Sequence, residues 1–136
     1  MITQEQLPMV AIPSMNDTHL EEMLIINKLD AAISDSNIEV IAKTINELLA
    51  HTIIHFLEEE KMMEEGLYPE YLTHKSEHDR HVGELKSLVQ YFQRTKDPKA
   101  IYAYSKGNLT PWRVHHIETM DTMMALFLKS EPTTGR

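Results

Sequence analysis

The stretch HTIIHFLEEE at residues 51–60 decides how the rest of the chain is interpreted. On a helix, residues four positions apart point the same way and lie one turn, about 5.4 Å, apart. His55 and Glu59 therefore share a face, where an imidazole and a carboxylate can begin a metal site. A solvent-exposed acidic helix that carries a histidine by chance gives the same pattern, so this stretch alone leaves both interpretations open.

The composition is that of one folded domain. The chain has 136 residues, close to the commonest domain size and enough to bury a core. A hydrophobic fraction of 42%, with four glycines and six prolines, argues against disorder and against a turn-rich all-β fold. The lack of cysteine excludes disulfides, thiolate metal sites and cysteine nucleophiles.

Charge and hydropathy limit which partners and which cell compartment are expected. A formal net charge of −8 argues against a nucleic-acid partner. No apolar run approaches the ~20 residues that cross a bilayer, and the N-terminus has no basic region ahead of an apolar block, as a secretory signal would. We therefore expect a cytoplasmic protein without membrane contact, and no protein partner can be read from the sequence.

Helical periodicity and capping signals predict two long helices in the first half of the chain. The first should start at a capping box, residues 18–21, or slightly before it, and should end near Ser34. A second capping box at 36–39 starts the next helix, and Gly66 is placed to end it. This second helix should cover about 37–65.

The second half of the chain predicts a third long helix, a short helix and a fourth long helix. Pro69 suits the first turn of the third helix. Asp97-Pro98 caps the short helix, which should end near Gly107, and Thr110-Pro111 opens the final helix, which should run to about residue 130. The inward face of the final helix, by regular spacing, comprises Trp112, His116, Thr119, Met123 and Phe127.

These helices predict an all-α fold, an antiparallel up-down four-helix bundle with a short extra helix between the third and fourth long helices. We expect residues 1–136 to form a single domain. Residues 1–13 should be an irregular leader, and residues 131–136 a flexible tail.

Histidines recur on the inward face of every long helix. They are His19, His55, His74, His78 and His116. A lone histidine on an apolar face is usually a hydrogen-bonded core residue, but burying this many without partners would cost about 1–3 kcal/mol for each unsatisfied group. A shared metal removes that cost. Imidazole and carboxylate ligands without sulfur suit iron, zinc or manganese, and two bridging carboxylates favour a pair of metals.

The order of these motifs resembles that of the hemerythrin family, in its single-domain bacterial form. The family pattern is an isolated histidine on the first helix, His-Phe-x-x-Glu-Glu on the second, His-x-x-x-His on the third, and Trp-x-x-x-His-Ile followed by Asp on the fourth. The matching residues are His19, His55, Phe56, Glu59, Glu60, His74, His78, Trp112, His116, Ile117 and Asp121. The match spans roughly residues 16–128.

The resemblance implies a non-haem di-iron centre that binds dioxygen. The implied ligands are His74, His78 and His116 for one iron, His19 and His55 for the other, and Glu59 and Asp121 as bridges beside an oxo or hydroxo group. In hemerythrins, dioxygen binds reversibly as a hydroperoxide at the iron with two histidines. An apolar pocket, matched here by Phe56, Trp112 and Ile117, keeps water away. The implied role is oxygen carriage, storage or sensing.

Other functions remain open at this point. The same di-iron site would also suit an enzyme that consumes peroxide, dioxygen or nitric oxide. The chain lacks the Glu-x-x-His pairs that ferritin-like di-iron oxidases carry on two helices, which argues against an enzyme. An iron or redox sensor that acts through a partner and a structural bundle without metal are the remaining alternatives.

Two positions depart from the family pattern. Arg113 stands where hemerythrins commonly have an oxygen-pocket leucine, and it either swings outward to water or points into the pocket as a charged donor. His81 faces inward and is a hydrogen-bonded core residue, a proton donor beside the site, or an extra ligand. If either reaches the pocket, the oxygen adduct should autoxidise quickly. His51 should pack behind the site or near the bundle end, and His115 should be exposed.

One implied pair of ligands does not follow from regular helix geometry. His116 and Asp121 are five residues apart, which is about 140° around an α-helix. Either a wide π-type turn lies between them, or the two side chains reach the site from opposite edges of one face.

Overall fold

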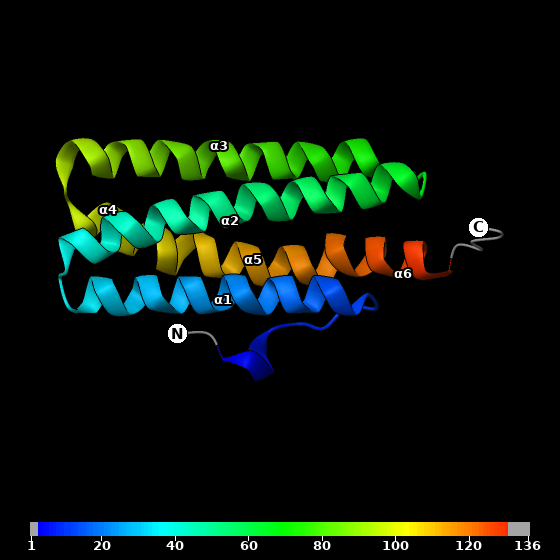
Figure 1. The fold of residues 1–136 in the computed structure, drawn as a ribbon, viewed down its shortest axis with the longest axis horizontal. Coiled ribbons are helices and arrows are strands. Elements are labelled where there is room, and N and C mark those ends of the chain that lie inside the picture. The colour runs from blue at the N-terminus through cyan, green and yellow to red at the C-terminus, as the bar shows by residue number, and fades with distance from the viewer. Residues whose placement is uncertain (1–2, 131–136) are drawn as a thin grey trace.

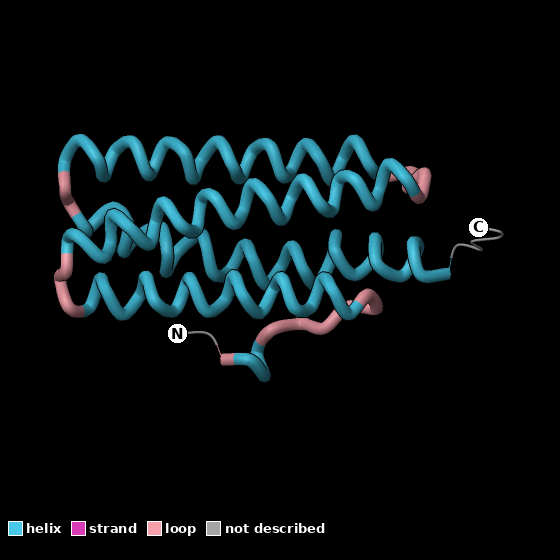
Figure 2. The backbone as a smooth tube through the Cα atoms, viewed as in Figure 1, coloured by secondary structure: helices cyan, strands magenta, loops and turns pink. Residues whose placement is uncertain are grey.

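Four long helical segments run antiparallel and side by side in the computed structural model, which describes residues 3–130 (Figure 1, Figure 2). They are α1 (Pro13–Ser34), α2 (Ile38–Glu65), α3 (Tyr71–Thr95) and a last segment that contains α4 (Pro98–Tyr104), α5 (Thr110–His116) and α6 (Thr122–Ser130). A short 3-10 helix, η1 (Gln4–Gln6), precedes them, and the described residues contain no strand. The predicted all-α up-down bundle is confirmed. The predicted tail, residues 131–136, lies outside the described residues.

The first long helix, α1, starts ahead of the predicted capping box. Its first residue is Pro13, which suits that position because the first N–H groups of a helix have no intrahelical partner. Thr18 lies inside the helix, where its hydroxyl donates to the Ser14 carbonyl at 3.1 Å. The Asn16 side chain accepts from the N–H of Val10 at 2.8 Å and donates to its carbonyl at 2.9 Å. The end of the leader is therefore tied to α1.

The turn between α2 and α3 shows why a glycine follows the second helix. α2 ends where the sequence predicted. Gly66 has φ −89°, and it is Leu67, with φ 53°, that takes the left-handed conformation. A Cβ atom at position 66 would collide with Cδ2 of Leu128 on α6. The glycine therefore leaves room for the Leu128 side chain and is not needed for a left-handed backbone.

The last helical segment continues where a break was predicted, and two of its stretches are π-helical. The predicted end of the short helix near Gly107 is replaced by η2 (Ser105–Leu109), and η3 (Ile117–Asp121) follows α5. A π turn is one residue wider than an α turn and hydrogen-bonds i→i+5. Because η2 ends just before Pro111, the wide turn makes room for a proline ring and a missing N–H within a continuous helix.

The second π-helical stretch, η3, changes which residues face inward after it. Thr119 is exposed and Met123 is 63% exposed, so the prediction that they face the core is wrong. Asp121, Met124 and Ala125 are buried in their place. The extra residue in the wide turn rotates the following turns, which regular helical spacing does not anticipate.

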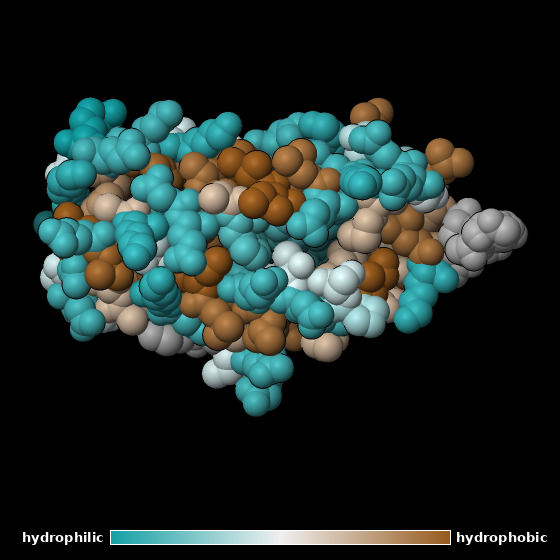
Figure 3. Space-filling view, viewed as in Figure 1, coloured by the Kyte–Doolittle hydropathy of each residue, from teal (hydrophilic) through white to brown (hydrophobic). Residues whose placement is uncertain are grey.

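The core of the bundle has apolar ends and a polar middle. One end is filled by side chains from α1 to α4 and from η2, among them Leu29, Ile41, Leu48, Phe92 and Ile101. The other end is filled by Met15, Met63, Met124 and Ala125. Between these clusters lie the buried histidines and carboxylates. On the outside, the face in Figure 3 is mostly hydrophilic, with smaller apolar patches, and none of the described helices has the length and apolarity of a membrane span.

Candidate metal centre

The structure gathers the seven predicted ligand residues in one buried site between the helices. One group consists of Glu59, His74, His78, His116 and Asp121, and a second consists of His19, His55 and Glu59. Within each group, one nitrogen or oxygen of every residue lies within 4.8 Å of the others. Every one of these side chains belongs to a residue at most 2% exposed. All four long helical segments contribute.

Glu59 on α2 faces both groups of histidines. Its Oε2 lies 2.6 Å from His55 Nε2 and 3.7 Å from His19 Nε2. Its Oε1 lies 3.1 Å from His78 Nε2, on the other side of the carboxylate. One carboxylate oxygen is therefore directed at the two-histidine group and one at the three-histidine group.

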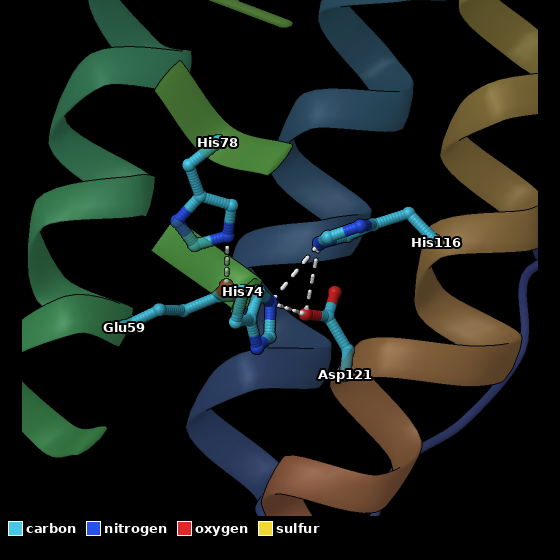
Figure 4. A group of neighbouring side chains, drawn as sticks. All are labelled: Glu59, His74, His78, His116 and Asp121. Carbon is cyan, nitrogen blue, oxygen red and sulfur yellow. Dashed lines mark hydrogen bonds and ion pairs between the residues drawn. The ribbon is translucent and has the colours of Figure 1, made fainter. Parts of the chain in front are cut away.

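Asp121 on the last helical segment has the same two-sided placement. Its Oδ2 lies 3.1 Å from His19 Nε2, while its Oδ1 lies 3.1 Å from His74 Nε2 and 3.3 Å from His116 Nε2. In Figure 4 the Asp121 carboxylate points toward the imidazoles of His74 and His116, and Glu59 approaches from the opposite side. The two carboxylates thus lie between the two groups of histidines.

The π-helical stretch η3 is what brings Asp121 to this position. It spans the residues between His116 and Asp121, and the hydroxyl of Thr122 donates to the carbonyl of Ile117, five residues back, at 2.7 Å. Of the two predicted explanations, the wide turn is the correct one. A regular α-helix would place the side chains of His116 and Asp121 about 140° apart, and the extra residue in the wide turn brings them to the same face.

Several buried polar atoms of the site have no hydrogen-bond partner among the described residues. They are His19 Nε2, His78 Nε2, Glu59 Oε1, Asp121 Oδ1 and Asp121 Oδ2. In addition, His74 Nε2 and His116 Nε2 lie 3.1 Å apart, where two lone pairs would repel unless a proton or cation lay between them. Unpaired buried groups cost about 1–3 kcal/mol each. Cations bound by nitrogen and oxygen would satisfy them all, so this donor set fits metal ions that accept imidazole and carboxylate.

The charges of the site also favour a bound cation. Burial and Asp121 act to raise the pKa of Glu59, but His55 and His19 outweigh them and hold it below its ordinary value. The pKa of Asp121 is held well below its ordinary value, against burial, by the histidines close to its carboxylate, His116 first. Burial acts to lower the pKa of His19, yet Asp121 and Glu59 raise it. Two ionised carboxylates therefore attract positive charge, as protons or as metal, to the imidazoles.

Two buried glutamates orient ligand histidines from behind. Glu22 Oε2 lies 3.0 Å from His55 Nδ1, and Glu60 Oε2 lies 2.9 Å from His78 Nδ1. With Nδ1–H donating to a carboxylate, Nε2 is left as the lone pair directed at the site, the usual arrangement behind a metal-bound histidine. Neither glutamate was predicted to take part. The available signal for Glu22 was its position three residues after His19, on the same helical face.

Arg113 points into the bundle, which is the inward one of its two predicted placements. It is 3% exposed and forms an ion pair with Glu22. Its guanidinium carbon lies 5.9 Å from the ring centre of Phe56 and 5.6 Å from that of Trp112. Burial lowers the pKa of Arg113 to about 10, so the side chain remains charged at neutral pH. Glu22 also accepts from His51 Nδ1 at 2.9 Å, which makes His51 part of this buried polar cluster.

Aromatic rings enclose the three-histidine side of the site. Phe56 stacks on His78 with 3.8 Å between ring centres, and Trp112 stacks on His116 at 4.6 Å. The indole N–H of Trp112 donates to Glu77 at 2.8 Å, which fixes the ring. Ile117, the remaining predicted pocket residue, is fully buried in a small apolar cluster. Apolar rings therefore cover two of the three imidazoles on that side.

His81 lies behind this aromatic layer and outside both groups of candidate ligands. It is 1% exposed and stacks on Trp112 with 4.0 Å between ring centres. Its Nδ1 lies 3.5 Å from the Tyr104 hydroxyl, and burial lowers its pKa to about 3, so it is neutral. Of its three predicted roles, the hydrogen-bonded core residue describes these contacts. His115 is exposed, as predicted.

Known proteins with similar sequence and fold carry the same kind of domain. The family described as "Hemerythrin HHE cation binding domain" matches residues 11–127. The chain is 28% identical over 111 residues to a bacteriohemerythrin of Aquifex aeolicus, covering 82% of this chain and 85% of that protein. It is 27% identical over 108 residues to a bacteriohemerythrin of Methylococcus capsulatus, covering 79% and 81%. A crystal structure of wild-type hemerythrin shares the fold, with a TM-score of 0.78, 23% identity, and 94% and 96% of the two chains covered.

Proposed function

The chain belongs to the hemerythrin family, and on that premise we propose that it holds two iron ions in the buried site and binds dioxygen there for carriage, storage or sensing. The observation that carries the proposal is the two-sided placement of Glu59 and Asp121. A carboxylate with one oxygen toward each of two metal positions can bridge them. The proposed ligands are His74, His78 and His116 for one ion, His19 and His55 for the other, and Glu59 and Asp121 for both.

The unequal number of histidines explains how one site can both hold metal and accept a ligand. Two ferrous ions held here would supply two electrons to dioxygen, and the ion held by only two histidines, His19 and His55, would be the one with room for a further ligand. The protein supplies orientation: Glu22 holds a proton on His55 Nδ1 and Glu60 holds one on His78 Nδ1, so that both Nε2 lone pairs face the metal positions. Phe56, Trp112 and Ile117 exclude water.

A second candidate function, consumption of peroxide, dioxygen or nitric oxide, is favoured by the Arg113–Glu22 pair. An apolar pocket protects reduced oxygen from protons, whereas this pocket contains a buried guanidinium and a buried carboxylate one hydrogen bond from His55. Buried charged groups can donate or accept hydrogen bonds to a reduced ligand and so favour its loss as peroxide. The same iron site would then turn over instead of releasing dioxygen unchanged.

Iron loading tests the site itself. The metal-free protein is mixed with ferrous iron without oxygen, and bound iron is counted after desalting, with two ions expected per chain. His116→Ala should lower this number, because it removes one proposed ligand. His115→Ala is the matched control, because the neighbouring histidine is exposed. Loss of iron in both variants, or no iron in the unaltered protein, would refute the proposed site.

Oxygen titration then separates the two candidate functions. The iron-loaded protein is mixed with dioxygen in a stopped-flow spectrometer and afterwards flushed with inert gas. A spectrum that forms and reverses, with all the dioxygen recovered, supports carriage, storage or sensing. Rapid oxidation that does not reverse, with continued uptake of dioxygen or peroxide when a reductant is present, supports the enzyme.

A further inference from the structure

Two cavities of about 310 Å³ approach the buried site from opposite sides of α2. The first, called here the α1–α2 cavity, lies between those helices and reaches His55 and Glu59. The second, the α2–α3 cavity, reaches Phe56 and His78. Each cavity therefore borders a different group of proposed ligands, and the two differ in chemistry.

The α1–α2 cavity carries net negative charge, although the methionines Met15 and Met62 form part of its lining. Its rim includes the hydroxyl-bearing Thr18 and the exposed carboxylates of Glu58 and Glu65, with Lys61 as the one cation among the residues that line it. At its buried end lies Glu59, which is 1% exposed and whose Oε2 is directed at His55 and His19. A cation that enters here meets carboxylates at the rim and again at the buried end.

The α2–α3 cavity differs from the first in having a lining of balanced charge. The side chains of Ile53, Leu57 and Val82 form much of its lining, beside the aromatic ring of Phe56. Its acidic residues, Glu60 and Asp79, are matched by Lys75 and Lys86. At its buried end, His78 presents a ring already stacked on Phe56 and hydrogen-bonded to Glu60. No charge attracts a cation along this route.

We propose that the α1–α2 cavity is the route by which ferrous iron enters and leaves the bundle. A hydrated divalent ion needs oxygen ligands that replace its water one by one, and a cleft lined by one sign of charge raises both its local concentration and its rate of association. Glu58 and Glu65 supply the charge at the mouth, and Glu59 supplies the first buried ligand. The inference rests on the proposed iron site and adds its loading route.

Filling each cavity in turn tests the route. Thr18→Phe fills the α1–α2 cavity, and Val82→Phe fills the α2–α3 cavity as the matched control, since both positions are half-buried and line only their own cavity. Trp112 is the single tryptophan and stacks on the proposed ligand His116, so its fluorescence reports the arrival of iron. Uptake is followed by stopped-flow mixing of metal-free protein with ferrous iron, and release by adding a chelator.

Thr18→Phe should slow uptake and release several-fold by the same factor, with unchanged iron content and affinity at equilibrium, because a blocked route changes rates only. Val82→Phe should load at the unaltered rate. If Thr18→Phe loads normally, or if Val82→Phe is the slowed variant, the α1–α2 cavity is not the route. Circular dichroism and equilibrium iron content show that each variant is folded. An unaltered protein that binds no iron at all would overturn the proposed function, a result distinct from normal loading in Thr18→Phe.

Charge at the rim gives a second test that leaves the cavity open. Glu58→Gln combined with Glu65→Gln should slow uptake on the order of tenfold at low ionic strength, and the difference should shrink as salt is added. Asp79→Asn at the other cavity is the control and should have little effect. Equal slowing in the control, or no slowing in the double variant, would mean that rim charge does not guide the ion.

Discussion

Removing both members of the Glu22–Arg113 ion pair should destabilise the protein by less than the sum of the two single removals. The Glu22 side chain is 0% exposed and that of Arg113 is 4% exposed, so a single substitution leaves a buried charge without its counter-ion. Breaking a buried pair in this way typically costs about 3–5 kcal/mol, whereas replacing both members with apolar residues is often neutral. The pair should therefore show strong coupling in a double-mutant cycle.

The two single substitutions should not be equal. Glu22→Leu strands the Arg113 guanidinium and also removes the acceptor for His51 and His55, so we expect the full ~3–5 kcal/mol. Arg113→Leu leaves Glu22 with both histidine partners, and His51, whose side chain is 22% exposed, can carry the compensating proton. We expect about 1–3 kcal/mol for this variant. The coupling energy of the cycle should be about 2 kcal/mol or more.

Urea unfolding of metal-free protein, followed by far-ultraviolet circular dichroism, measures the cycle without a contribution from iron binding. The control is the same cycle on Lys75 and Asp79, an ion pair of 2.9 Å on the surface of α3 whose side chains are 38% and 63% exposed. That pair should couple by less than about 0.5 kcal/mol. If the buried pair couples no more strongly than the surface pair, the reasoning about uncompensated charge is refuted.

Further predictions concern the glycines, the metal-free protein, and the residues Arg113 and His81. Gly83→Ala should raise the free energy of unfolding by about 0.4–1 kcal/mol, because a Cβ there meets nothing within 4 Å. Gly66→Ala should give no such gain, because its Cβ must displace the end of the Leu128 side chain. Urea midpoints of both variants check this, and equal effects would contradict it. In the metal-free protein, nearby carboxylates raise the pKa values of His19 and His55 above 6.5, against the effect of burial. The stability that these two protonated histidines contribute is therefore complete below pH 6.5, and it is lost as the pH rises through the raised pKa values. Melting temperatures should therefore fall with rising pH in metal-free protein and fall less once iron replaces those protons, and parallel pH profiles would count against this. Finally, Arg113→Leu should slow the decay of the oxygenated protein, because Arg113 lies beside Glu22, a hydrogen-bond partner of His55. His81→Leu should leave the decay rate unchanged, because His81 lies behind Trp112. The decay of the visible spectrum measures both rates.

Most of the fold and two pairs of candidate ligands could be predicted from local spacing, whereas the complete set of ligands came from the family resemblance. His55 and Glu59, like His74 and His78, are four residues apart, and an α-helix places such pairs on one face whatever surrounds them. The end of α2 followed from its glycine, although for a different reason, since the contact with Leu128 comes from another helix. Local rules therefore found the right residues even where the physical cause was a tertiary contact.

The remaining features depend on contacts between distant parts of the chain. The direction of Arg113 is set by Glu22 on another helix, and no property of the residues beside Arg113 reveals that partner. The inward face of α6 was predicted wrongly at Met123, because the π-helical stretch before it adds a residue that regular spacing does not include. Both features became clear only when the backbone path and the packed neighbours were known.

The polar layer in the middle of the bundle also fixes how the four helices are aligned along their length. Apolar side chains of similar size are interchangeable partners, so an all-apolar core tolerates a helix that slides by one turn past its neighbours. Glu59 and Asp121 each need histidines from other helices at one height, and a slide of about 5.4 Å would part them from all of these partners at once. The same side chains that would hold the metal therefore act as a register lock, as a single buried polar residue does in a coiled coil.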